Sequence, residues 1–317
     1  MQCQYADPFL GGGLQGSWLE NLATGPSNSI LSTRLDIPAV YQITPPQARC
    51  GSGAGTVSAK LIQSFPGVTG ALGIAEYKKN HFAVIAGNFS LKTSESTAGS
   101  YAIWDVWFTG ARLDRVSAKK ITDIPSGGFL NGLTVLNKRS GTLLVGDSWN
   151  GTVYRLNPET GDYKIVLQDE TMKPPAGKNL GLNGIRTVSI GDELFLYYTN
   201  SLKETVGRVR IDPETGRATG AYTTLATKVW GDDFTYDRAK GDLYVAGNFE
   251  NIVTKLNREG IVEGIIGAEN QLTVAGATST LVIDRTLYVA TSGALAAPVN
   301  GTITEGAKIV AVKLDQM

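Results

Sequence analysis

The stretch that decides the fold is Asn131-Gly-Leu-Thr-Val, followed by Gly141-Thr-Leu-Leu-Val-Gly-Asp-Ser and Gly151-Thr-Val-Tyr-Arg-Leu. Its three runs of aliphatic and β-branched residues, separated by turns that contain glycine, predict three antiparallel strands. The same unit begins again at Asn183-Gly-Ile-Arg-Thr-Val and at Asp232-Asp-Phe-Thr-Tyr, and shorter matches begin near residues 20, 72 and 278. The six starts lie 46 to 59 residues apart, which is enough for three or four strands each. The repeat therefore predicts an all-β fold, a six-bladed β-propeller.

Turn signals support this reading over its alternative, a pair of β-sandwiches, which would not explain a sixfold repeat. Asn157-Pro-Glu-Thr-Gly and Asp212-Pro-Glu-Thr-Gly mark the same turn, between the third and fourth strands of two blades. No helical linker or charge run divides the chain, so we expect one domain over residues 1–317, with residues 1–17 as an N-terminal surface tail. Two long polar loops, 90–100 and 170–182, are expected to cover the site.

Composition excludes several classes of partner. The chain has 29 Lys and Arg against 29 Asp and Glu, so there is no electrostatic basis for binding nucleic acid. No apolar run approaches the roughly 20 residues of a membrane span. The oligomeric state stays open at this level.

Weak signals favour the secretory pathway or an extracellular location, with the cytoplasm as the alternative. Cys3 and Cys50 are the only cysteines and could form one disulfide, or remain two free thiols. Acceptor triplets for N-glycosylation begin at Asn88, Asn150 and Asn300, although such triplets also arise by chance.

The candidate site lies where the first strands of the blades begin around the axis. Four of the six starts carry oxygen-bearing side chains, which are Glu20, Asn131, Asn183 and Asp232. Two carboxylates and two amides form a ligand set suited to a hard cation, Ca²⁺ or Mg²⁺. The alternative is that these residues only close turns. If the predicted register of this strand is wrong by one residue, Asp233 takes the place of Asp232 as the site residue.

A second group of residues is expected at the same mouth, because the second strand of each blade ends there. This group supplies the candidate substrate-binding residues Asn88, Asn200 and Asn248, together with the aromatic residues Trp149, Trp230 and Phe249. It also includes Arg34, Asp147, Ser292 and Tyr197. The alternative for the aromatic residues is packing between blades; it applies equally to Trp149 and Trp230, and it is favoured for Tyr197 or Tyr198, one of which must face a core. The single histidine, His81, is expected to be a solvated turn residue. One histidine excludes a His-dyad lactonase, and a solvated turn histidine does not suit a Ser-His-Asp triad.

The ordered set of motifs resembles the fungal branch of the senescence-marker-protein/gluconolactonase-like propellers over nearly the whole chain. The motifs that carry the resemblance are Trp18-Leu-Glu-Asn-Leu-Ala, Leu130-Asn-Gly-Leu-Thr, Leu182-Asn-Gly-Ile-Arg, Gly231-Asp-Asp-Phe and Ala277-Thr-Ser. The resemblance implies one divalent metal held by Glu20, Asn131, Asn183 and Asp232. It also implies that Asp232 is the acid or base.

Three functions follow as hypotheses. The resemblance implies either a metal-dependent lactonase or a hetero-Diels–Alderase of terpenoid secondary metabolism. The latter would couple a tropolone-type quinone methide, formed by dehydration of an alcohol, with a humulene-type sesquiterpene. It would need no cofactor for the cycloaddition, and Asp232 would act with Arg34 or Tyr197. The apolar start at Leu72, the low charge and the two tryptophans favour this apolar small-molecule substrate. A non-catalytic binding propeller is the third hypothesis.

Overall fold

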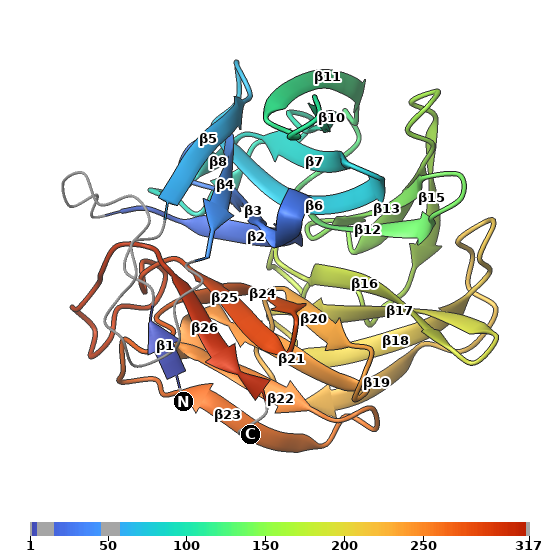
Figure 1. Ribbon diagram of the computed structural model, residues 1–317. Coiled ribbons are helices and arrows are strands. Elements are labelled where there is room, and N and C mark those ends of the chain that lie inside the picture. Colours follow the sequence, from blue (N-terminus) through green and yellow to red (C-terminus); the bar gives the residue numbers. More distant parts are fainter. Residues whose placement is uncertain (1, 5–15, 46–57, 315–317) are drawn as a thin grey trace.

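The computed structural model describes residues 2–4, 16–45 and 58–314, which form six four-stranded antiparallel sheets. Figure 1 shows the sheets around a common centre, and the colours follow the chain around the ring. The prediction of a six-bladed β-propeller is confirmed. The described residues contain no helix long enough to cross a bilayer, since their helices are the two short 3-10 turns η1 (Pro26–Asn28) and η2 (Asn248–Glu250).

Each blade begins with a strand that lies against the axis. These innermost strands are β2 (Leu19–Thr24), β6 (Gly70–Lys78), β12 (Leu130–Asn137), β16 (Leu182–Ile190), β20 (Phe234–Asp237) and β24 (Ala277–Ile283). Each contacts the innermost strands of the two neighbouring blades, so the six close a ring. The predicted starts fall within two residues of the observed ones.

The second, third and fourth strands of each blade follow outward from the axis. The second strands are β3 (Ile30–Arg34), β7 (His81–Gly87), β13 (Thr142–Asp147), β17 (Glu193–Asn200), β21 (Asp242–Gly247) and β25 (Thr286–Thr291). The third are β4 (Ala39–Thr44), β10 (Ala102–Thr109), β14 (Thr152–Leu156), β18 (Thr205–Ile211), β22 (Ile252–Leu256) and β26 (Ile309–Lys313). The fourth are β5 (Ser58–Ser64), β11 (Arg115–Asp123), β15 (Tyr163–Gln168), β19 (Thr223–Thr227), β23 (Val262–Gly267) and β1 (Gln2–Gln4).

The last blade takes its outer strand from the other end of the chain. β1 pairs antiparallel with β26, and Cys3 lies opposite Ala311. The expectation of a surface tail over residues 1–17 is therefore wrong for Gln2–Gln4. The reason is that β26 would otherwise present an unpaired edge, and the N-terminal segment is the chain that reaches it. The predicted Cys3–Cys50 disulfide involves Cys50, which lies outside the described residues.

The turns behave as their sequences predict. The Asn157 amide donates to the carbonyl of Asp162, and the Gly161 amide donates back to that of Asn157. This turn joins β14 to β15, and the matching turn at Asp212 joins β18 to β19. In the second turn, hydrogen bonds from Thr215 lower the pKa of the Asp212 carboxyl.

The core lies between the blades rather than in one central mass. Successive sheets bury alternate side chains against each other, as in the cluster that joins Ala83 and Ile85 of the second blade with Leu133, Val145 and Tyr154 of the third. The axis is left for polar side chains, which is the feature that positions the site.

Candidate functional site

A cavity of about 630 Å³ opens at the end of the axis where the innermost strands begin. All four predicted metal-ligating residues line it, since Glu20, Asn131, Asn183 and Asp232 form its polar floor. Each of these four side chains is buried. The structure thus brings together residues from blades one, three, four and five, of which Glu20 and Asp232 are 212 positions apart in the chain.

A repeated irregularity of the innermost strands turns these side chains toward the axis. The pairing of first and second strands shifts near the start of the strand in five blades, between Leu19 and Leu22, Ala71 and Ile74, Leu130 and Leu133, Leu182 and Ile185, and Ala277 and Ser279. Three of these shifts contain a site residue, Glu20, Asn131 or Asn183, and Asp232 lies just before β20. Such bulges redirect side chains and are common next to active sites. Asn131 and Asn183 lie inside strands, so the alternative that they merely close turns is wrong.

The glycine after each asparagine allows the blades to meet closely at the floor. A Cβ atom on Gly132 would lie 2.3 Å from the carbonyl oxygen of Asn183, and one on Gly184 would lie 2.5 Å from Oδ1 of Asp233. Distances this short leave no room for any side chain. Each Asn-Gly pair therefore has two roles. The asparagine is a site residue, and the glycine lets the backbone of the next blade, which carries the next site residue, come close.

Burial disfavours the charged form of both carboxyl groups of the floor. Burial raises the pKa of Glu20 well above its usual range, and the negative charge of Asp232 raises it further. Burial raises the pKa of Asp232 to about 7, with Asp233 adding to the shift and a hydrogen bond from Asn248 opposing it. A carboxyl group with a pKa near neutrality can both donate and accept a proton. The floor is therefore equipped for acid–base chemistry.

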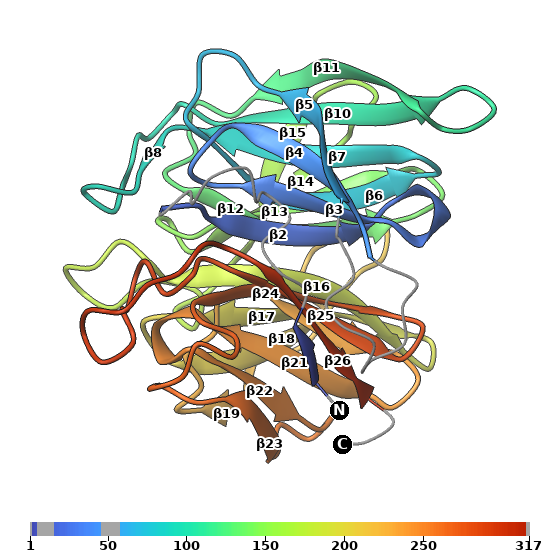
Figure 2. The same ribbon diagram turned by 60° about the vertical axis from the view of Figure 1, so that its left-hand side comes forward.

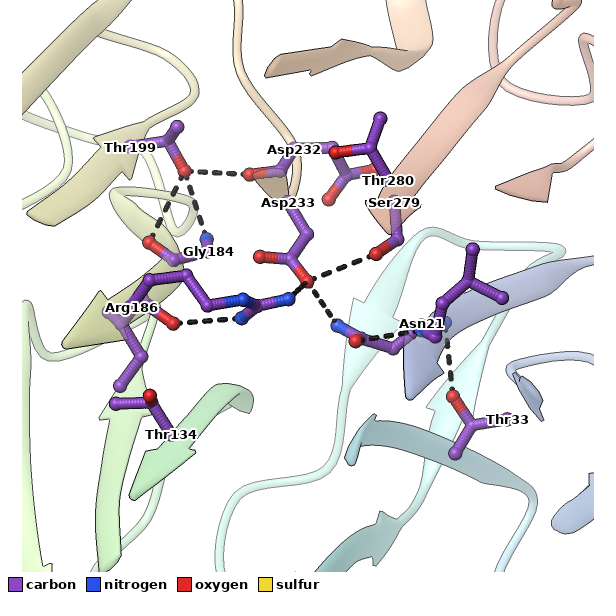
Figure 3. Close-up of polar contacts among 12 residues, drawn as sticks. Asn21, Thr33, Thr134, Gly184, Arg186, Thr199, Asp232, Asp233, Ser279 and Thr280 are labelled. Carbon is purple, nitrogen blue, oxygen red and sulfur yellow. Dashed lines mark hydrogen bonds and ion pairs between the residues drawn. The ribbon is translucent and has the colours of Figure 1, made fainter. Parts of the chain in front are cut away.

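Hydrogen bonds hold Asp232 from its own blade and from blade four. Its side chain accepts a hydrogen bond from Nδ2 of Asn248 at 3.1 Å, and its backbone carbonyl accepts one from the Thr199 hydroxyl at 2.6 Å. Figure 3 shows Thr199, Gly184 and Asp232 side by side. On the opposite side of the floor, the indole N–H of Trp18 donates to Oε2 of Glu20.

The floor also fits a divalent cation. Oδ1 of Asn183 is buried and accepts no hydrogen bond, whereas Nδ2 of the same side chain donates to Ser201 at 2.9 Å. An unsatisfied amide oxygen beside two carboxyl groups is what a hard cation requires. Within the described ranges, no three His, Cys, Asp or Glu side chains gather into a metal-binding group, so the two amides must complete any such site.

The walls of the cavity are aromatic and aliphatic. Phe89 stacks on Phe129 with 5.1 Å between ring centroids, and Trp230 packs on Phe249 at 4.8 Å. The predicted residues Trp149, Trp230, Phe249 and Asn248 all line the cavity. An apolar wall above a small polar floor suits an apolar small molecule that is oriented by a few polar groups.

Long loops complete the wall, as expected. The loop at 90–100 contains the hairpin of β8 (Phe89–Ser90) and β9 (Glu95–Ser96), which projects from the ring in Figure 2. Leu91 from this hairpin and Leu180 from the loop 170–182 both line the cavity.

Four predicted site residues do not line the cavity. Arg34 is buried and ion-paired with Asp36. Tyr197 is buried inside its blade, where its hydroxyl accepts a hydrogen bond from Arg208 at 2.9 Å. The other two residues, Asn88 and Asn200, lie outside the cavity lining. The Asn200 amide instead donates to the backbone carbonyls of Thr171 and Lys173 and holds a loop in place.

The error behind these assignments is the assumption that every residue at the end of a second strand points to the axis. Asp147 shows the alternative use, because its carboxylate accepts hydrogen bonds from the backbone amides of Gly128, Phe129, Trp149 and Asn150. Asp232 lines the cavity and Asp233 does not, so the register given first was right.

His81 is half-buried rather than a solvated turn residue, since it begins β7. Its Nδ1 lies 2.9 Å from Oδ2 of Asp105, and its ring stacks on Trp107.

Some cavity residues were missed from the sequence. They are Trp18, Leu35, Phe89, Leu91, Phe129, Leu180, Leu202, Leu295 and Ala296. Most of them follow or precede a strand end by one to four residues. No local pattern separates such residues from ordinary blade packing.

The fold and the cavity define a six-bladed propeller with a pocket on its axis, and solved structures share this architecture. A luciferin-regenerating enzyme is similar over 99% of this chain and 95% of its own, with a TM-score of 0.66 and 14% identity. A calcium-binding regucalcin from Agrobacterium tumefaciens is similar over 87% and 85%, with a TM-score of 0.57 and 14% identity. Virginiamycin B lyase from Staphylococcus aureus is similar over 98% of both chains, with a TM-score of 0.55 and 13% identity.

At these identities the likeness establishes the fold alone. No protein-family model matches the sequence, and no curated protein matches it either.

Proposed function

We propose that this protein is an enzyme that couples two apolar molecules in the axial pocket by a hetero-Diels–Alder reaction. The observation that carries the proposal is an aromatic-walled cavity of about 630 Å³ above a floor carboxyl, Asp232, whose pKa is raised to about 7. A sugar lactone would find few polar partners on such walls. A tropolone-type alcohol and a humulene-type alkene match them better.

The first step is loss of water from the alcohol. Protonated Asp232 donates its proton to the departing hydroxyl group, and the C–O bond breaks to release water. The Asp232 carboxylate left by this transfer then takes the proton of the substrate's ring hydroxyl, and a neutral quinone methide results. Arg34 and Tyr197, the partners expected for Asp232, do not line the cavity, so Asp232 carries both proton transfers in this proposal.

The second step is the cycloaddition, in which one C–C bond and one C–O bond form and no atom is lost. The aromatic walls hold the two reactants together, and such positioning can contribute about 7–11 kcal/mol to the lowering of a barrier. No cofactor is required for this step.

The test is to incubate the protein with a hydroxymethyl tropolone and humulene and to detect the product by mass spectrometry. We expect an adduct whose mass is the sum of the two reactants minus one water. Asp232→Asn should abolish it, whereas Asp242→Asn, a buried carboxyl of the same blade outside the cavity, should not. Free tropolone alcohol with no adduct would rule out this activity for these substrates.

A second candidate function, metal-dependent lactone hydrolysis, is favoured by one specific observation. The buried Oδ1 of Asn183 has no hydrogen-bond donor and faces a floor with two carboxyl groups. Glu20, Asn131, Asn183 and Asp232 would hold a Ca²⁺ or Mg²⁺ ion, which would polarise the lactone carbonyl. In this case, Asp232 would take a proton from the attacking water.

Metal content and lactonase turnover distinguish the two candidates. A stoichiometric divalent ion together with gluconolactone hydrolysis that stops after chelation would support the lactonase. Absence of hydrolysis with added Ca²⁺ and with added Mg²⁺ would remove the lactonase and leave the coupling reaction to be tested as above.

A further inference from the structure

A buried carboxylate lies on the axis directly after the site residue Asp232. Asp233 is 3% exposed and does not line the cavity. Asp232 lines the pocket, whereas the Asp233 side chain is directed toward Asn21, Arg186 and Ser279. The proposed function uses Asp232 and assigns no task to Asp233.

Asp233 contacts side chains from three other blades across the axis. Its Oδ2 accepts hydrogen bonds from Nδ2 of Asn21 at 2.7 Å and from the hydroxyl of Ser279 at 3.1 Å. The same oxygen forms an ion pair with Nη2 of Arg186. Figure 3 shows the three partners converging on this carboxylate from different sides. One carboxylate thus connects blades one, four, five and six at the centre of the ring.

The backbone around Asp233 connects to the same blades. Its amide donates to the carbonyl of Thr278 at 3.0 Å, and the amide of Gly184 donates to the carbonyl of Asp232 at 3.2 Å. Gly184 in turn follows the site residue Asn183. A shift of the Asp233 side chain would therefore be transmitted to two of the four floor residues.

We infer that Asp233 and Arg186 form a clasp across the propeller axis that fixes the positions of Asp232 and Asn183 in the pocket floor. They are positioning residues, since neither lines the cavity. The clasp acts through the contacts that Asp233 makes with blades one, four and six. Its role is therefore the same for either of the two proposed reactions.

The competing explanation is that Arg186 only neutralises a buried charge. The two explanations differ for the double variant Arg186→Met, Asp233→Asn. Removing one partner of a buried ion pair leaves an uncompensated charge, whereas removing both does not. If charge neutralisation is the whole role, the double variant regains both stability and floor order. If the pair is a clasp, the double variant regains stability only.

The experiment measures the thermal unfolding midpoint and amide hydrogen exchange on the full chain. The informative peptides cover residues 182–187 and 230–236, which contain the Gly184 and Asp233 amides. Each single variant should lower the midpoint by about 5–10 °C, and the double variant should recover at least half of that loss. Exchange in both peptides should stay about tenfold faster than in the wild type in all three variants.

A matched control is the Lys255–Asp242 ion pair, which is buried to a similar degree in blade five but lies away from the axis. Asp242→Asn should lower the midpoint without changing exchange in either floor peptide. Wild-type exchange rates in the two floor peptides of the double variant would overturn the clasp. The clasp would also be overturned if Asp242→Asn accelerated exchange in these peptides as much as the Asp233 and Arg186 variants do.

Discussion

Two carboxyl groups, Glu20 and Asp232, occupy the pocket floor, and among the described residues neither is ion-paired with a basic side chain. Their raised pKa values follow first from burial, with the charge of Asp232 adding to the shift of Glu20 and that of Asp233 adding to the shift of Asp232. At the scale of single residues, the chemistry of the site is a consequence of burial rather than of an unusual residue type.

Replacing Asp232 by Asn should therefore remove the acid–base group while preserving the side-chain shape. We expect turnover of the substrate to fall at least about 100-fold. Steady-state kinetics would check this, with Asp242→Asn as the folded control. Unchanged turnover would show that Asp232 takes no part in the reaction.

The raised pKa of Asp232 also predicts how stability depends on pH. In the unfolded chain the carboxyl ionises near its ordinary value of 3.8, whereas in the folded protein it keeps its proton until about pH 7. The unfolded state therefore binds fewer protons between these values, and this group reduces stability as the pH rises through that window.

Asp232→Asn removes that penalty, so the variant should gain stability over the wild type at pH 8 and show little difference at pH 4. The gain is about 1.4 kcal/mol per unit of pKa shift, hence a few kcal/mol in all. Urea unfolding in a chelating buffer at both pH values would measure it. A difference that does not change with pH would contradict the burial argument.

At the scale of elements, the bulged start of the innermost strand determines where Glu20, Asn131 and Asn183 point. The bulge sits beside a glycine whose missing side chain lets adjacent strands approach, as at Gly132 against the Asn183 carbonyl. The order of an innermost strand and the shape of the floor are therefore coupled.

Gly132→Ala should separate β12 from β16, because the new Cβ would lie 2.3 Å from a backbone oxygen. We expect a loss of about 1–3 kcal/mol in the free energy of unfolding, together with loss of activity. Gly264→Ala is the control, since a Cβ there would meet no atom within 4 Å. Equal stability of the two variants in urea unfolding would argue against the close-approach role.

At the scale of the whole molecule, the ring is closed by pairing between the two ends of the chain. β1 supplies the outer strand of the blade that ends with β26, whose residues Val310 and Val312 are buried. Closure of this kind removes an exposed edge and connects the first blade to the last.

Deleting residues 1–4 should lower the free energy of unfolding by roughly 1–4 kcal/mol, because three residue pairs of backbone are lost. Replacing Gln2, Cys3 and Gln4 with three threonines should preserve stability, since threonine keeps the backbone pairing. Thermal unfolding measures both. A loss of stability in the threonine variant would point to the Cys3 side chain, and so to the predicted disulfide.

The sequence by itself determined the number of blades, the start of each innermost strand and the four floor residues. It could do so because Glu20, Asn131, Asn183 and Asp232 occupy equivalent positions in their repeats. Equivalent positions at the start of each innermost strand meet around the axis once the ring closes. The turns at Asn157 and Asp212 could also be predicted from the local sequence, since their proline and glycine fix the backbone without distant contacts.

Only the tertiary structure decided which other residues reach the cavity. Tyr197, Asn200 and Arg34 carry suitable side chains, yet each finds its partner within its own blade or an adjoining loop. The walls come instead from residues such as Phe89 and Leu180, brought to the mouth by loops of unequal length. The direction of those side chains depends on packing between segments far apart in the chain, which no local pattern records.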